Sequence, residues 1–331
     1  GWVKITSIDN PDVTKEIEIS IIRRVESVSL DKSEVTLNKG ETSVLSATVM
    51  PSDAHNKKYS FSSSDESVVT VSEDGTVTAT GSQFRLRQAT NLQHATVTLL
   101  NDVYLAHFSS DKEEANYTTT MGALTSTSTT CSVGTGTYNV GCLDTDFSFA
   151  GILGNRAVLN KYGEGTMTLT GSSNACPVNI YGGAIEAANT AKAYTTGLTT
   201  VKSGGKLYGK GIASNVTVEK EGIVAATKTG LPTARLKVNG NLTVNREGVV
   251  QVRARKSTSK VSNDGFEVSG TAKFTSPVFE ITLTNDAAWA AGDSIQVVKT
   301  EGRIILTGTP TFIPEIPGEG LLWDDSTFTT D

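Results

Sequence analysis

Residues 157–187 read AVLNKYGEGTMTLTGSSNACPVNIYGGAIEA, and short alternating apolar runs in this segment are separated by glycines. Met167 and Leu169 form one alternating pair, and Val178 and Ile180 form the next. Each alternation predicts a strand of about four to six residues with one buried face. The glycines predict corners where the chain bends or where two backbone segments approach closely.

The same pattern recurs further along the chain, which indicates an array of coils. Glycines at positions 165, 183, 205, 222 and 248 are separated by 18, 22, 17 and 26 residues. A spacing of about 20 residues with variable loops is typical of a solenoid. It does not fit a propeller, whose blades are longer and more uniform.

Two segments of this array resemble a known family. The run LNKYGEGTMTL at 159–169, followed by IYGGAIEA at 180–187, resembles the autotransporter-associated β-strand repeat of bacterial surface proteins. The run LKVNGNLTVNREGVVQV at 236–252 is similar to the late coils of autotransporter passengers. The resemblance implies a right-handed parallel β-helix. Most such folds hold a surface away from a cell, and a minority cleave polysaccharides.

Residues 23–94 predict a separate small β-sandwich, because short alternating strands recur there with turn residues between them. The motifs VESVSLDKSEVTLNKGET at 25–42, VMPSDA at 49–54 and DGTVTA at 74–79 resemble the bacterial group 2 immunoglobulin-like domain of intimin and invasin stalks. Phe61 stands where that family usually has a core tryptophan. Of the domain boundaries, the C-terminal boundary of this domain is the one that the motifs define least well.

The two ends of the chain predict further domains of the same polypeptide. Residues 1–22 resemble the last two strands of a preceding immunoglobulin-like copy, and tandem copies usually act as spacers. Residues 95–331 are expected to form the β-helix and its C-terminal cap, in which Pro310, Pro314 and Pro317 interrupt strand pairing. A further segment beyond Asp331, such as a secretion or anchoring signal, is also expected.

Composition excludes several classes of partner. Lys and Arg number 29 against 35 Asp and Glu, the net charge is −6, and no basic patch stands out, so nucleic acid is not an expected partner. No apolar run approaches the about 18–20 residues that span a bilayer, so we expect no membrane insertion of this fragment. A charged fraction of 19% with many turn residues favours an extracellular or cell-surface β-protein.

Few residues offer catalytic chemistry. His55, His94 and His107 are interpreted as structural or solvated, and no Gly-x-Ser-x-Gly motif occurs. Cys131 and Cys142 could close a loop by a disulfide in an oxidising compartment, or all three cysteines, Cys176 included, could be buried thiols. The absence of Cys-x-x-Cys spacing argues against structural zinc.

Asp144 and Asp146 are the carboxylates that merit attention, because alternate residues of a strand share one face. β-Helix lyases and hydrolases use paired carboxylates, with calcium or a basic residue beside them. Arg156 and Lys161 are the nearby basic residues. These four are the catalytic candidates, Asp144 and Asp146 are the calcium candidates, and a solvated acidic face is the simpler interpretation.

Tyr162, Tyr181 and Tyr208 lie near corresponding coil corners, 19 and 27 residues apart. If they stack outward, they form a ladder for sugar rings, and if they point inward, they are core. The core is the preferred interpretation.

The sequence therefore predicts an all-β protein, with an immunoglobulin-like β-sandwich followed by a right-handed parallel β-helix. The expected function is a non-enzymatic extracellular adhesin or stalk that needs no cofactor, with calcium as the one ion considered. A polysaccharide or a glycoprotein is the expected partner. The alternative is a β-helix polysaccharide lyase or hydrolase, or the accessory module of one. An enzyme requires Asp144 and Asp146 to meet Arg156 or Lys161 in a groove.

Overall fold

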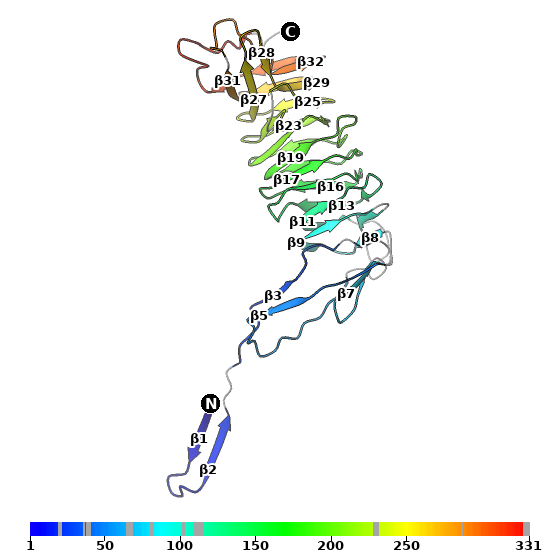
Figure 1. The fold of residues 1–331 in the computed structure, drawn as a ribbon, viewed down its shortest axis with the longest axis vertical. Helices are drawn as coiled ribbons and strands as arrows, with labels where there is room; N and C mark the ends of the chain where they lie inside the picture. Colours follow the sequence, from blue (N-terminus) through cyan, green and yellow to red (C-terminus); the bar gives the residue numbers. More distant parts are fainter. Residues whose placement is uncertain are drawn as a thin grey trace.

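The computed structural model describes residues 1–18, 22–35, 37, 41–63, 69–79, 83–100, 103–108, 116–227, 232–285 and 287–326. The protein is all-β, and these ranges contain no α-helix. Consequently, none of the described residues forms a helix long and apolar enough to cross a membrane. Figure 1 shows a column of stacked coils with smaller β-structures at its N-terminal end.

The N-terminal strands β1 (Trp2–Thr6) and β2 (Thr14–Glu18) form an antiparallel hairpin. All ten residues of the two strands are exposed, and the hairpin stands apart from the rest of the chain in Figure 1. That these strands complete a preceding immunoglobulin-like copy remains a prediction.

The next strands form two small antiparallel sheets. Strand β3 (Ser27–Leu30) pairs with β5 (Ala47–Met50) in one sheet, and β4 (Thr42–Val44), β7 (Thr76–Ala79) and β6 (Val69–Val71) form the other. The turn before β7 contains Gly75, whose φ is 84°. A Cβ there would lie 2.1 Å from the carbonyl oxygen of Leu45 and 3.0 Å from the Phe61 ring, so only glycine fits.

The remainder of the chain winds through three parallel sheets in the order sheet III, sheet I, sheet II, except that the first two coils have no strand in sheet II and the coils of β18 and β20 have none in sheet III. Sheet I contains β9 (Thr90–Thr98), β11 (Thr118–Thr125), β13 (Gly136–Val140), β16 (Ala157–Lys161), β18 (Val178–Ile180), β20 (Thr199–Val201), β23 (Val216–Val218), β26 (Leu242–Val244), β30 (Ala272–Thr275) and β33 (Ile304–Thr307). Sheet II contains β14 (Phe147–Phe149), β17 (Thr166–Leu169), β19 (Gly183–Ala187), β21 (Gly205–Gly209), β24 (Ile223–Ala225), β27 (Val249–Lys256), β31 (Val278–Asn285) and β34 (Thr311–Ile313), with β28 (Val261–Asn263) antiparallel to β27. Sheet III has two parts, β8 (Gln83–Leu86), β10 (Tyr104–His107), β12 (Ser132–Val133) and β15 (Ile152–Leu153), then β22 (Ile212–Ala213), β25 (Arg235–Val238), β29 (Gly265–Val268) and β32 (Val298–Thr300). This winding is a β-helix, as the sequence predicts.

Parallel pairing begins earlier than residue 95, where the sequence pattern placed the start of the β-helix. Strands β8 and β9 already pair in parallel with β10 and β11. The first coil also contacts the sandwich, because the Thr96 amide donates to the Ser33 carbonyl at 3.2 Å. The segment 83–94 does not match the expected closing strand of the sandwich because it belongs to the solenoid sheets.

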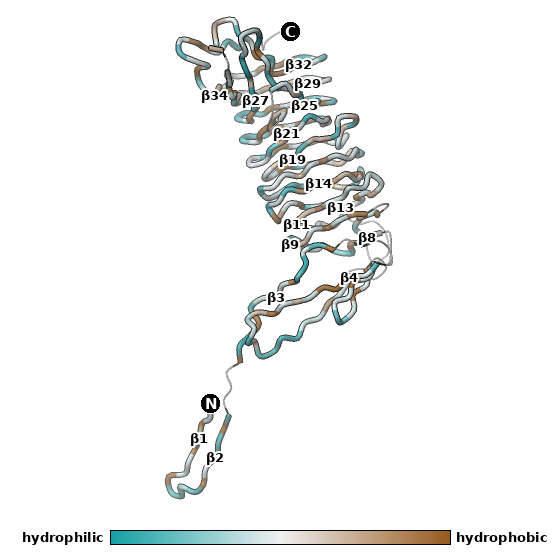
Figure 2. The backbone as a smooth tube through the Cα atoms, in the orientation of Figure 1, coloured by the Kyte–Doolittle hydropathy of each residue, from teal (hydrophilic) through white to brown (hydrophobic). Residues whose placement is uncertain are grey.

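The core is a set of ladders of inward-facing side chains. In β13 and β16 buried and half-buried residues alternate, and in Figure 2 hydrophobic and hydrophilic residues alternate along the coils. Tyr138, Leu159 and Val178 align in successive strands of sheet I and are at most 1% exposed. Each strand therefore turns one face into the core, where its side chains stack on those of the strands above and below. The period-two alternation of the sequence requires this arrangement.

The C-terminal end of the column is closed by aromatic rings. Phe279 stacks on Phe312 with ring centroids 5.5 Å apart, and Phe312 stacks on Trp323 at the same separation. The Trp323 indole donates to the Pro314 carbonyl at 2.9 Å. These contacts cover the last coil, which would otherwise present an open edge.

Candidate functional site

Asp144 and Asp146 lie at the corner between β13 and β14, and each accepts a backbone hydrogen bond from the following coil. The Glu164 amide donates to Asp144 Oδ1 at 2.8 Å, and the Thr166 amide donates to Asp146 Oδ1 at 2.7 Å. Asp144 has a φ of 56°, a left-handed conformation that Asp tolerates better than most residues. Both carboxylates thus fasten one coil corner to the next.

Arg156 and Lys161 lie at opposite ends of β16. Arg156 immediately precedes the strand and Lys161 ends it, so about 16 Å of extended backbone separates them. Asp144 and Asp146 are near the Lys161 end. The structure therefore places Lys161, and not Arg156, beside the two carboxylates.

Lys161 is fully buried, which is rare for a lysine side chain. Its Nζ donates to the carbonyls of Tyr162 at 2.5 Å, Gly163 at 3.0 Å and Gly182 at 3.4 Å. Burial lowers the pKa of the Lys161 ammonium from 10.5 to about 8, and the charges of Asp144, Glu164 and Asp146 oppose this shift. The side chain joins the backbones of two coils.

A pH titration of stability should reveal this burial. The folded pKa lies below the unfolded value, so the unfolded state binds more protons between about pH 8 and 10.5, and Lys161 contributes stability that increases as pH rises through this window. We expect wild type to gain about 3 kcal/mol over Lys161→Met across it. Measured unfolding free energies check this, and a pH-independent difference would contradict it. Cys176 and Tyr194, whose buried groups have raised pKa values, affect both proteins alike.

Replacing Asp146 tests whether its carboxylate is structural. Asp146→Ala leaves the amide of the buried Thr166 without its acceptor and should cost about 1–2 kcal/mol of unfolding free energy. Asp146→Asn keeps an acceptor oxygen at the same position and should cost clearly less. Urea unfolding of both variants checks this, and equal losses would show that charge, not the hydrogen bond, is what matters.

No three His, Cys, Asp or Glu side chains of the described ranges gather in a way that could hold a metal ion. The calcium candidates Asp144 and Asp146 each accept a hydrogen bond from a backbone amide, and the Lys161 ammonium lies near both of them.

The three candidate tyrosines do not form one ladder. Tyr162 and Tyr181 stack with ring centroids 4.8 Å apart and planes within 3°, and Tyr181 is 39% exposed. Tyr208 is buried elsewhere, in sheet II, with Ala184 and Ala225. Tyr162 and Tyr181 therefore make an outward two-ring stack, and the third tyrosine is packed away from solvent.

The cysteines are free thiols, and Cys131 donates to Ser126 Oγ at 3.1 Å. His107 is fully buried, lies 2.7 Å from Thr119 Oγ1 and stacks on Tyr138. Burial lowers the pKa of its imidazole, which favours a neutral packing role. His55 and His94 are exposed.

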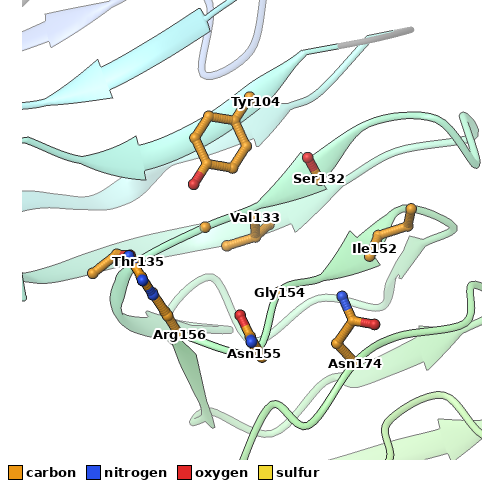
Figure 3. A pocket seen from close by; sticks show the side chains of 10 residues that line it. Tyr104, Ser132, Val133, Thr135, Ile152, Gly154, Asn155, Arg156 and Asn174 are labelled. Atoms are coloured by element: carbon orange, nitrogen blue, oxygen red, sulfur yellow. The ribbon is translucent and has the colours of Figure 1, made fainter. Parts of the chain in front are cut away.

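Sequence reasoning missed a groove of about 510 Å³ on the outer face of sheet III. Tyr104, Ser132 and Ile152 occupy aligned positions of β10, β12 and β15 and form one wall. In Figure 3 the side chains of Asn155 and Arg156 lie across the groove from Tyr104.

The floor of this groove is made of glycines. Gly134 and Gly154 continue β12 and β15, since their amides donate to the Leu105 and Val133 carbonyls at 2.6 and 2.7 Å. A Cβ on Gly134 would lie 2.0 Å from the Tyr104 hydroxyl oxygen, so the phenol lies directly over this glycine. The spacing of 20 residues between Gly134 and Gly154 was the one signal of this groove in the sequence. Strands β12 and β15 have only two residues each, which is too short to show an alternating pattern.

Comparison with known proteins identifies part of the chain. Residues 24–82 match the bacterial Ig-like domain (group 2) family, and this match ends where β8 begins. The chain is also similar to a kappa-carrageenase of Pseudoalteromonas carrageenovora, with 36% identity over 78 residues, which is 24% of this chain. The matched part spans 20% of the length of that relative.

Proposed function

We propose that this chain is a non-enzymatic extracellular module, an adhesin or stalk, whose β-helix presents a surface for binding carbohydrate. The group 2 immunoglobulin-like domain at residues 24–82 supports an extracellular setting. The column of in-register coils supports a presenting role, because sheet I pairs every coil with its neighbours from β9 to β33 and sheets II and III add further parallel pairing along parts of the column.

One observation carries the proposal over a catalytic role. Asp144 and Asp146 use a carboxylate oxygen each to hold the backbone of the next coil, and Lys161 is enclosed by three carbonyls. Arg156 lies at the other end of β16. A general acid or base must reach the substrate proton that it transfers, and this arrangement supports fastening of coils instead.

The likeness to a kappa-carrageenase supports carbohydrate as the class of partner. Because it covers about a fifth of that relative, it equally favours a second candidate, the non-catalytic accessory module of a larger polysaccharide-degrading enzyme. Both candidates bind glycan without cleaving it.

Depletion of the purified chain onto insoluble polysaccharides tests the proposal. The panel contains plant, animal and bacterial polymers, each with and without calcium, and bovine serum albumin as the non-binding control. We expect depletion onto at least one polymer and no calcium requirement. Failure to bind any polymer would remove the carbohydrate-binding function.

A further inference from the structure

We infer that the outer face of sheet I around Asn160 and Asn179 binds an uncharged, extended polysaccharide chain that lies along the column of coils. This inference rests on the proposed carbohydrate-binding function and names the site and the ligand class.

A row of uncharged hydrogen-bonding side chains runs along this face. Parallel pairing aligns one outward-facing position of each strand, and from β11 to β26 that position is occupied by Asn or Thr. The residues of the row are Thr120, Asn139, Asn160, Asn179, Thr200, Thr217 and Thr243. All except Thr200 are partly exposed. The row crosses six steps of about 4.8 Å, or about 29 Å, so several sugar rings can lie along it.

The amides of the row bind one another and keep capacity for a ligand. Asn179 donates to the Asn160 side chain, and Asn160 donates to the Asn139 side chain, each at 2.9 Å. An amide has two N–H donors and a carbonyl oxygen with two lone pairs, so each of these bonds uses one donor and one lone pair. The Asn179 side-chain carbonyl accepts no hydrogen bond within the described part of the chain. The ladder therefore orients the amides and leaves donors and acceptors for sugar hydroxyls.

Two aromatic rings stand beside the amides of this row. Residues two positions apart on an extended strand share a face, and Tyr162 and Tyr181 each follow an Asn of the row by two positions. The amides of the two tyrosines continue the parallel pairing, at 2.7 and 2.8 Å from carbonyls of the preceding coil. The rings stack with centroids 4.8 Å apart, and Tyr181 is 39% exposed. They give the polar row an apolar edge on one side.

The opposite edge of the row is also apolar at these coils. Pro177 and Leu198 each precede a residue of the row by two positions, and both are exposed, Leu198 by 46%. A pyranose ring has hydroxyls around its rim and C–H groups on its faces, and the C–H groups pack on apolar and aromatic surfaces. A polar row between two apolar edges matches that distribution.

The charge of this face favours a neutral ligand. The positions two residues before the row are uncharged as well, and they are Thr118, Thr137, Val158, Pro177, Leu198, Asn215 and Asn241. On the tyrosine side, the next charged residues, Lys202 and Glu219, pair with each other at 2.7 Å. Charged residues make up 19% of the chain, so this face differs from the average surface. A charged polymer would lose water here without gaining an opposite charge.

The groove over β10, β12 and β15 is a poorer site, although it is hollow. The Tyr104 phenol fills the space over Gly134, and both Tyr104 and Arg156 already interact with other residues of the chain. The row on sheet I keeps its hydrogen-bonding capacity, so it is the better candidate.

Titration calorimetry tests the inference. The neutral probes are β-1,4-linked oligomers of glucose, mannose and N-acetylglucosamine of increasing length, and carboxymethylated glucose oligomers are the anionic form of the first backbone. We expect wild type to bind at least one neutral backbone, at least tenfold more tightly than the anionic oligomers, with an affinity that rises with length. Leu198→Glu and Tyr181→Ala should each weaken this binding at least tenfold. Ser148→Glu places the same charge on the outer face of sheet II and should bind as wild type does.

Conservative variants separate ligand contact from a loss of structure. Tyr181→Phe keeps the ring, and Leu198→Gln keeps a side chain of similar size without a charge, so both should retain most of the affinity. Circular dichroism and urea unfolding confirm that each variant is folded. A loss for Leu198→Gln as large as that for Leu198→Glu would contradict the requirement for an uncharged face.

The outcomes also separate the site from the function. Binding that both Leu198→Glu and Tyr181→Ala leave unchanged would place the glycan elsewhere and overturn the inference, while the proposed function stands. Tighter binding of the anionic oligomers would overturn the ligand class. Binding of no neutral backbone, while the protein still depletes onto another polysaccharide, would overturn it too. No binding of any oligomer and no depletion onto any polymer would overturn both the inference and the proposed function.

Discussion

Gly205→Val is expected to destabilise the solenoid by about 3 kcal/mol, because a side chain has no room between the coils there. A Cβ on Gly205 would lie 2.1 Å from the Ile180 carbonyl oxygen, which belongs to the backbone of the preceding coil. Backbone on both sides is held by parallel pairing, since Gly205 aligns with Gly183 in sheet II. The added side chain can be accommodated only if the two coils separate.

Denaturant unfolding of Gly205→Val and of Gly318→Val measures this effect. A Cβ on Gly318 would meet only a Leu321 methyl carbon at 3.3 Å, so this matched substitution should change stability little. Because a solenoid repeat contacts mainly its neighbours, hydrogen exchange should speed up most in β19 and β21. Equal stability of the two variants would contradict the tight stacking of coils at this corner.

Phe274→Ala is expected to cost about 3–5 kcal/mol. Phe274 is fully buried, aligns with Val244 and Leu306 in sheet I, and packs on Phe279 with centroids 5.7 Å apart. Removing the ring leaves a cavity that the rigid coils above and below cannot fill.

Equilibrium unfolding with Lys273→Ala as the control checks this prediction. Lys273 is the exposed neighbour of Phe274 on the same strand, and its substitution should change stability by less than about 0.5 kcal/mol. Phe274→Leu should recover most of the loss. A similar loss for Lys273→Ala and Phe274→Ala would mean that the strand faces were assigned the wrong way round.

The fold was predictable because its determinants are local. Apolar residues at every second position, as in Met167 and Leu169, predict the buried face of a strand, and Gly165 and Gly205 mark the corners. At both glycines a Cβ would lie about 2 Å from a carbonyl of the preceding coil. The start of the solenoid was harder to predict, because β8 and β9 alternate poorly and pair only with strands further along the chain.

The candidate site was harder to predict than the fold, because it depends on how the coils stack. The spacing of residues along the sequence does not determine that stacking. Lys161 was a candidate base near Asp144, yet the corner at Gly163 folds over it and supplies carbonyl partners. Loop length between the coils decides which residues become neighbours, so Tyr104 and Asn174 line one groove although 70 positions separate them. Tyr162 and Tyr181 stack because 19 residues make one full coil there.

The most direct test of the central claim is a count of new chain ends after prolonged incubation of the wild-type protein with each polysaccharide that it binds, with calcium present. We expect depletion onto the polymer and no new reducing or unsaturated ends. New ends that disappear in Asp144→Ala or Asp146→Ala, with the fold retained, would contradict it and make the protein an enzyme.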